Sequence, residues 1–193
     1  MTKNRARARG GDVYERIDVV VVHATAGFAT QHAIDTWKTK KASAHWIVPD
    51  ENEPQHGNFV WAVVGEAKAA FHVGAVDYAP HIGAGPNANN RSLGIEIVNT
   101  QNVQNFEDPY SSWQVEATAK IITYAWAKYP NLNHVISHAK LDPTRRDDPG
   151  TNFPWSKLEE LVLSHAMVPA TNPLVTTPHV PNAPAAGASC CVP

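Results

Sequence analysis

The strongest constraint on the fold of this chain is an almost unbroken run of β-branched residues near its start, IDVVVVH at residues 17–23. The run lacks the apolar–polar alternation of a half-exposed strand, and it therefore predicts a strand that is buried. Such a strand must be covered by other elements of the fold. The run ends in His23, which places a titratable side chain at the end of an otherwise apolar segment.

Other segments supply further strands and the helices that cover them. Their β-branched and aromatic residues predict short strands at 44–48, 59–64, 93–98 and 135–137. Apolar residues at helical spacing predict helices that begin near Thr30 and that span 114–128 and 155–164. Thr30 is expected to cap the first helix. Because strands and helices mix without a regular parallel repeat, we predict an α/β fold of the α+β type, a single domain with a central mixed β-sheet flanked by helices.

Composition divides the chain into three parts. Residues 1–13 are polar and basic and predict a flexible basic arm, whereas 14–166 carry the predicted strands and helices. Residues 167–193 are rich in Pro and Ala, which predicts a disordered tail. The only cysteines, Cys190 and Cys191, lie in this tail. Adjacent cysteines enclose almost no loop, so a disulfide framework is excluded and a metal site in the core must use histidine and carboxylate ligands.

Charge and hydropathy argue against two classes of partner. The net charge is −2 and the isoelectric point is near 6.5, whereas a general nucleic-acid binder needs a basic surface. No apolar run reaches membrane-spanning length, so no membrane insertion is expected. The basic start is not followed by an apolar stretch of secretory length, and we therefore expect no ordinary signal peptide. A target outside the cytoplasm would then require another route of delivery.

Three side chains that are far apart in the sequence have the chemistry of a catalytic zinc site. His23 ends the buried strand, His138 follows the brief strand at 135–137, and Asp148 lies in a loop that Pro and Gly stiffen. Two imidazoles and a carboxylate leave a fourth tetrahedral position for water. The spacing alone does not establish a metal site, because the ligands are not clustered in sequence. Each histidine alone is compatible with a surface residue or a hydrogen-bonded residue, and the aspartate with turn formation.

Five segments occur in an order and at separations typical of one family: VVVHATAG (20–27), SAHWIV (43–48), AFHVG (70–74), NNRSLGIEIVN (89–99) and SHAKLDPTRRDDPGTNFPW (137–155). Together they resemble the zinc-dependent N-acetylmuramoyl-L-alanine amidase family, which includes phage lysozyme-like amidases, murein-recycling amidases and peptidoglycan recognition proteins. The resemblance covers essentially the whole predicted domain. It implies a hydrolase that uses Zn²⁺ to cleave the amide bond between N-acetylmuramic acid and L-alanine in bacterial peptidoglycan.

The resemblance assigns the metal ligands residue by residue. His23 matches the first zinc ligand of the family, His138 the second and Asp148 the third. Asp147 is the nearest alternative to Asp148. We favour Asp148 because the aspartate ligand of the family directly precedes the Pro-Gly pair, as Asp148 does.

Two further positions match catalytic groups of the family. Glu96 matches the acidic residue that faces the metal water and is expected to act as general base. Arg146 lies where many members carry a catalytic lysine. Because arginine does not readily release a proton, Arg146 is expected only to hold and stabilise negative charge. Ala44 stands where some members carry a tyrosine that assists catalysis, which leaves proton transfer to Glu96.

Four residues are expected near the substrate. His45 and His72 match positions where relatives often carry histidine. His45 is either structural or a substrate contact, and His72 either touches substrate or supports the metal ligands. Trp46 is a candidate for a groove that holds sugar rings and stem peptide, although a tryptophan ring is more often part of the core. Asn99 completes the set of expected substrate contacts.

Several biological settings are compatible with this reaction. We expect cell-wall lysis by a phage endolysin or an antimicrobial effector, with a holin or an immunity protein as genetic partner. Such an enzyme would act in the periplasm or cell wall after delivery without an ordinary signal. The alternatives are a cytoplasmic amidase that recycles anhydro-muropeptides and a peptidoglycan-binding protein without activity. The protein is expected to be a monomer.

Overall fold

The computed structural model describes residues 6–74, 78–85, 87–101 and 108–167. Most of the predicted tail, with Cys190 and Cys191, lies outside this part of the chain. The strands are β1 (Ala6–Ala8), β2 (Val19–Ala24), β3 (Trp46–Val48), β4 (Trp61–Ala62), β5 (Lys68–Ala70), β6 (Ser92–Ile97) and β7 (His134–Ser137). The helices are α1 (Val13–Arg16), α2 (Thr30–Thr39), α3 (Ala79–Ile82), α4 (Ala88–Arg91), α5 (Ser112–Lys128), α6 (His138–Leu141) and α7 (Trp155–Met167). None of the helices in these ranges is long and apolar enough to cross a membrane.

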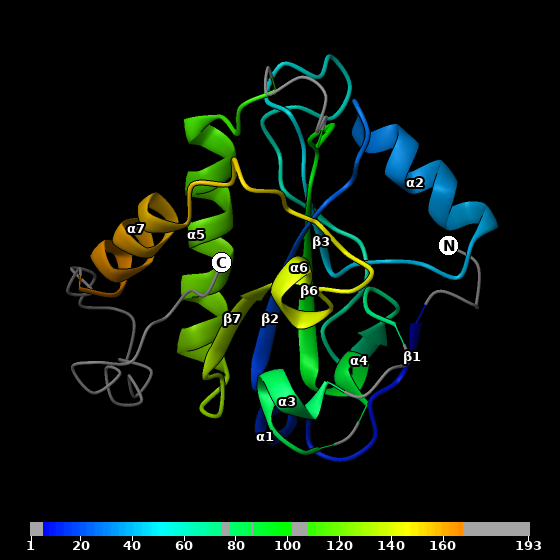
Figure 1. Ribbon diagram of the computed structural model, residues 1–193, viewed down its shortest axis with the longest axis vertical. Helices are drawn as coiled ribbons and strands as arrows, with labels where there is room; N and C mark the ends of the chain where they lie inside the picture. Colours follow the sequence, from blue (N-terminus) through cyan, green and yellow to red (C-terminus); the bar gives the residue numbers. More distant parts are fainter. Residues whose placement is uncertain (1–5, 75–77, 86, 102–107, 168–193) are drawn as a thin grey trace, which may run out of the picture.

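The main sheet has five strands in the order β4-β3-β6-β2-β7 (Figure 1). Strands β3, β6, β2 and β7 run parallel, and β4 pairs antiparallel with β3 at one edge. Strands β1 and β5 form a separate two-stranded antiparallel sheet. The main sheet is therefore mixed, and together with its helices it confirms the predicted α+β fold.

Both faces of the main sheet are buried, which explains why β2 is almost entirely apolar. On one face Val20 and Val22 belong to a core cluster that includes residues of α5, and α7 packs on α5 (Figure 1). On the other face Val19 and Val21 pack with residues of the short helices α3 and α6. All six residues of β2 are buried. Each fully buried valine contributes about 1.5–3 kcal/mol, so β2 holds the two layers together.

The register of the parallel strands aligns the predicted site residues. His23 on β2 pairs with Glu96 on β6, and Val22 pairs with Ser137 at the end of β7. The next residue after Ser137 is His138, which begins α6. Glu96, His23 and His138 therefore lie side by side at the carboxyl ends of three neighbouring strands.

Two of the predicted local features differ from the structure. Of the strand predicted at 59–64, only Trp61–Ala62 is paired, and both residues are exposed at the edge of the sheet. Thr30 does not cap α2 but is its first residue, and the Glu53 carboxylate accepts a hydrogen bond from the Thr30 backbone N–H at 2.9 Å. A carboxylate from elsewhere in the chain thus performs the capping, which local sequence patterns do not reveal.

The prediction of a flexible arm is wrong over residues 6–13. Ala6–Ala8 pairs with β5. Arg9 follows and is only 3% exposed. Its guanidinium donates hydrogen bonds of 2.7–3.0 Å to the backbone carbonyls of Glu66, Asn89 and Ser92. A buried cation is tolerated where its donors are satisfied, so a basic residue anchors this segment to the domain.

We predict that Arg9→Ala strongly destabilises the fold. The substitution leaves three carbonyls without their donor, and each buried unsatisfied group costs about 1–3 kcal/mol, so the free energy of unfolding should fall by at least about 3 kcal/mol. Arg7→Ala is the matched control, because among the described residues exposed Arg7 donates only to Asn87 at the surface. The control should change stability by less than about 1 kcal/mol. Urea denaturation measures both variants, and an unchanged midpoint for Arg9→Ala would contradict the anchoring role.

Candidate functional site

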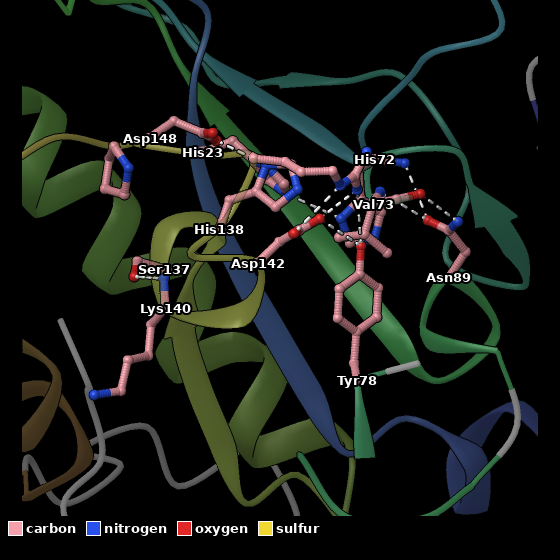
Figure 2. Close-up of polar contacts among 12 residues, drawn as sticks. His23, His72, Val73, Tyr78, Asn89, Ser137, His138, Lys140, Asp142 and Asp148 are labelled. Carbon is pink, nitrogen blue, oxygen red and sulfur yellow. Dashed lines mark hydrogen bonds and ion pairs between the residues drawn. The ribbon is translucent and has the colours of Figure 1, made fainter. Parts of the chain in front are cut away.

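Three polar side chains converge at the carboxyl ends of β2 and β7 (Figure 2). His23 comes from β2, His138 from the start of α6, and Asp148 from the loop that precedes α7. The atoms His23 Nδ1, His138 Nδ1 and Asp148 Oδ2 lie 3.0 Å from one another in each pair. The structure thus brings together the three predicted metal ligands, which form a group able to hold a metal ion.

The geometry of these three atoms fits a tetrahedral zinc ion. Zinc binds imidazole nitrogen and carboxylate oxygen at about 2.0–2.2 Å, which separates neighbouring ligand atoms by roughly 3.3 Å. The observed separations of 3.0 Å are close to that value. His138 turns Nδ1 into the cluster and leaves Nε2 buried without a hydrogen-bond partner among the described residues. A buried unpaired nitrogen costs about 1–3 kcal/mol, and a strong partner at Nδ1, such as a cation, would offset that cost.

The electrostatics keep the cluster in the protonation states that metals bind. Burial, reinforced by neighbouring His138, lowers the pKa of His23 to about 4, so its ring is neutral at pH 7. Burial alone would raise the pKa of Asp148, but its close contacts with His138 and His23 outweigh burial and hold this pKa well below its usual range. A neutral imidazole and an ionised carboxylate are the ligand forms that a metal requires.

The loop that carries the carboxylate is fixed by backbone contacts. The Asp148 side chain is largely buried, and its backbone carbonyl accepts a hydrogen bond from Ala139 N at 2.7 Å. The next carbonyl, of Pro149, accepts a hydrogen bond from the Tyr110 hydroxyl at 2.6 Å. Asp147 is exposed. The side chain that faces the two histidines is therefore that of Asp148, as the sequence predicts.

Glu96 and Arg146 lie at the edge of the cluster. Withdrawal of Glu96 from water, together with the charge of Asp148, raises the pKa of Glu96 to about 8, and the charge of Arg146 opposes this shift. Arg146 is exposed, yet its charge also acts on His23. Both residues are thus close enough to act on the same reacting group. Their catalytic roles stay predictions.

His72 packs against His23 on the side away from Asp148 (Figure 2). Its Nδ1 lies 3.0 Å from His23 Nε2, and its Nε2 lies 3.0 Å from Ser92 Oγ. Burial, with His23 and His45 nearby, lowers the pKa of His72 well below its ordinary value. Both ring nitrogens of His72 are engaged within the protein. Of the two roles predicted for His72, these contacts favour support of a metal ligand over contact with substrate.

The structure contradicts a substrate contact for His45, which is 0% exposed. Its Nδ1 accepts a hydrogen bond from Gly94 N at 2.9 Å, and its Nε2 lies 2.7 Å from the Arg9 guanidinium and 3.1 Å from the carbonyl of Lys68. Burial, with the charge of Arg9, lowers the pKa of His45 to about 3. The ring joins β6 to the segment at β5, so its role is structural.

Trp46 and Asn99 are also largely buried, and their surroundings give no support to the prediction that they contact substrate. Trp46 pairs in register with Ile95, so both side chains point to the face covered by α5, away from the cluster. Asn99 is 2% exposed. Its side-chain amide donates to the carbonyl of Asp108 and accepts from the N–H of Gln101, which ties two loop segments together.

The residues that surround His72 were not predicted from the sequence. Ser92 was not singled out, because a serine at the start of a strand carries no functional signal. Gly94 did carry a signal, since a glycine inside a predicted strand often marks the close approach of another group. A Cβ at Gly94 would lie 2.6 Å from Cγ of His72. The glycine thus makes room for this ring.

The sequence matches the N-acetylmuramoyl-L-alanine amidase family over residues 13–151. This range includes β2, β6 and β7 and every residue of the cluster. The chain therefore belongs to the N-acetylmuramoyl-L-alanine amidase family.

Two curated relatives show how far the similarity extends. The N-acetylmuramoyl-L-alanine amidase AmiD of Escherichia coli is 30% identical over 166 residues, which cover 82% of this chain and 56% of AmiD. The 1,6-anhydro-N-acetylmuramyl-L-alanine amidase AmpD of Citrobacter freundii is 26% identical over 123 residues, or 63% of this chain and 58% of AmpD. The chain thus spans little more than half the length of these relatives.

Solved structures agree with this assignment. AmpDh3 from Pseudomonas aeruginosa superposes with a TM-score of 0.65 at 27% identity, over 83% of this chain and 65% of that one. E. coli AmiD, in complex with the substrate anhydro-N-acetylmuramic acid-L-Ala-D-γ-Glu-L-Lys, gives 0.63 at 28% identity, over 80% and 60%. The Ph2119 endolysin, from a Thermus scotoductus bacteriophage, gives 0.51 at 18% identity, over 80% and 92%, and shares the fold alone.

We predict that zinc binding depends on Asp148 and not on Asp147. Asp148→Ala removes one of the three converging atoms and should weaken zinc binding by more than about 100-fold, since changes outside the ligand set already cost about 10–100-fold. Asp147→Ala is the matched control and should bind zinc like the wild type. Competition with a chromophoric chelator measures both affinities. Loss of zinc binding in Asp147→Ala alone would show that Asp147, and not Asp148, is the ligand.

Proposed function

We propose that the chain is a zinc-dependent N-acetylmuramoyl-L-alanine amidase. The observation that carries the proposal is the group formed by His23, His138 and Asp148, with Glu96 next to it on the neighbouring strand. Membership of the amidase family supports the reaction, and the donor set supports zinc. A protein that only binds peptidoglycan would have no need of this buried polar cluster, whose burial is costly without a bound ion.

The metal ligands and Glu96 have separate roles in amide hydrolysis. A zinc ion held by the three ligands would supply Lewis-acid chemistry, acidifying water and polarising the amide carbonyl. Glu96 takes a proton from the attacking water and returns it to the L-alanine nitrogen as the C–N bond breaks. The products are a free lactyl carboxylate and a peptide with a new amino terminus. The pKa of Glu96 is raised to about 8, and a zinc ion in the cluster would lower it toward neutral pH, so this carboxyl group is suited to both transfers.

Arg146 contributes fixed positive charge to this scheme. Its positive charge lowers the pKa of both Glu96 and His23, which supports a role for Arg146 beside the cluster. Because arginine stays protonated at neutral pH, it stabilises the developing oxyanion and takes no part in proton transfer. Glu96 is then the group that moves the proton.

We predict that Glu96→Gln abolishes hydrolysis and retains zinc. Loss of the general base should lower the turnover number by about 10²–10⁴-fold, while the three metal ligands stay in place. The assay is the release of peptides with new L-alanine amino termini from anhydro-muropeptide, with the zinc content measured on the same sample. Glu160→Gln is the control, because Glu160 is exposed on α7 and remote from the cluster. Full activity of Glu96→Gln would contradict the assignment of Glu96 as the general base.

The substrate that we propose is a muropeptide with an anhydro-muramic acid end. AmiD and AmpDh3 have been crystallised with an anhydro-N-acetylmuramic acid tripeptide and an anhydromuramic pentapeptide, respectively, at 28% identity to this chain. The relative AmpD is named for the same 1,6-anhydro sugar. The lytic role that we expected from the sequence stays a prediction, because the endolysin structures share the fold alone.

We predict that the soluble substrate is cleaved faster than intact cell wall. The measurement compares initial rates on a purified anhydro-muropeptide and on intact sacculi at equal concentrations of the amide bond. A recycling amidase should favour the soluble substrate by at least tenfold. Comparable or faster release from sacculi would instead support the lytic role of an endolysin or antibacterial effector. The Glu96→Gln variant serves as the blank in both assays.

A further inference from the structure

We propose that His72, anchored by Ser92, is a positioning residue that fixes which nitrogen of His23 faces the metal. This inference rests on the proposed metal site. His72 lies against the far side of the His23 ring and so acts through that ring (Figure 2). The three side chains form one chain of hydrogen bonds that ends on a backbone carbonyl, and that carbonyl determines the direction of every bond in the chain.

The donor and acceptor roles in these hydrogen bonds are set at Ser92. Its Oγ lies 2.6 Å from the carbonyl oxygen of Ala88 and 3.0 Å from Nε2 of His72. A carbonyl oxygen accepts hydrogen bonds only, and a serine hydroxyl has a single proton to donate. The shorter contact, to Ala88, therefore takes that proton. The Ser92 oxygen is left as the acceptor, so the proton between Ser92 and His72 is carried by His72 Nε2.

The proton on His72 Nε2 in turn determines the proton position of the metal ligand His23. A neutral imidazole carries a proton on only one nitrogen, so His72 Nδ1 is an acceptor. It lies 3.0 Å from His23 Nε2, which must then donate. His23 consequently carries its proton on Nε2 and presents an unprotonated Nδ1. That Nδ1 is the atom that lies 3.0 Å from Asp148 Oδ2 and from His138 Nδ1.

His72 is held firmly enough to play this role. The Asn89 side-chain oxygen accepts hydrogen bonds from the backbone N–H groups of His72 and Val73 at 3.0 and 3.1 Å, and its amide nitrogen donates to the Val73 carbonyl at 2.9 Å. The ring itself lies on Gly94, where a Cβ would come within 2.6 Å of its Cγ. Backbone and ring are thus both fixed, and no rotation of the ring is needed for it to meet His23.

The two histidine ligands differ in whether their outer ring nitrogen has a hydrogen-bond partner. His23 has its outer nitrogen bonded to His72, whereas the Nε2 of His138 has no partner among the described residues. A hydrogen bond to the outer nitrogen of a ligating histidine fixes its tautomer and orientation, and its loss typically costs about 10–100-fold in metal affinity. The hydrogen bonds from Ser92 through His72 therefore fix the orientation of His23 before a metal ion binds.

The test compares two substitutions of His72 in the otherwise intact chain. His72→Leu fills the space but removes the acceptor, and it should weaken zinc binding by about 10–100-fold in chelator competition. His72→Asn places Oδ1 where Nδ1 stood, so it keeps the acceptor and should bind zinc within about threefold of wild type. Leu158→Ala is the control for lost stability, because Leu158 is fully buried between α7 and α5, away from the site. Its zinc affinity should not change.

A second measurement reads the proton positions directly. In the wild-type protein labelled with ¹⁵N-histidine, long-range proton–nitrogen correlation spectra should show His72 and zinc-bound His23 each protonated at Nε2. A proton on His72 Nδ1 would overturn the proposal. So would equal zinc affinity in His72→Leu and wild type, or a loss in His72→Asn as large as that in His72→Leu.

These readouts separate the inference from the proposed function. If the wild type binds zinc but releases no L-alanine amino termini, the amidase proposal fails, and the loss in His72→Leu with rescue in His72→Asn still supports the role of His72. If the wild type cleaves the substrate and His72→Leu binds zinc unchanged, the role of His72 fails and the amidase proposal stands.

Discussion

The candidate site depends on the parallel pairing of β2 with β6 on one side and with β7 on the other. This pairing places Glu96, His23 and His138 in a row at the same end of the sheet. A shift of one residue in either ladder would turn the paired side chains to the opposite face. The continuous valines of β2, buried on both faces, prevent such a shift because they pack into both core layers at once. The apolar core thus fixes the geometry of a polar site.

Burial of the polar residues around this site is balanced by satisfied hydrogen bonds. A buried polar group without a partner costs free energy, and a buried cation costs more. Around the site, Asn89 holds two backbone N–H groups, Arg9 is satisfied by three carbonyls, and His45 bonds with both ring nitrogens. These residues hold loops and strands at fixed distances from His23. Much of what surrounds the cluster therefore positions it and does not touch substrate.

The sequence predicted the parts of the site that lie at strand ends and in specific motifs, and missed those that depend on which face a side chain takes. His23, His138 and Asp148 could be assigned because their segments are distinctive. The expected substrate contacts of Trp46 and Asn99 gain no support, because motif position says nothing about the face of the sheet or about loop contacts. Arg9 was missed because composition cannot separate one buried arginine from exposed neighbours such as Arg7. Tertiary contacts, absent from local pattern, decide these cases.

Strand β6 shows how one short segment can encode both the core and the site. Its sequence SLGIEI alternates between two faces, as every strand does. Leu93, Ile95 and Ile97 point into the core beneath α5. The intervening residues face the site, where Ser92 orients the proton of His72, Gly94 leaves room for that ring, and Glu96 lies beside His23. A glycine in a strand costs about 0.5–1 kcal/mol relative to alanine, and the ring packed against Gly94 gives a physical reason for that cost.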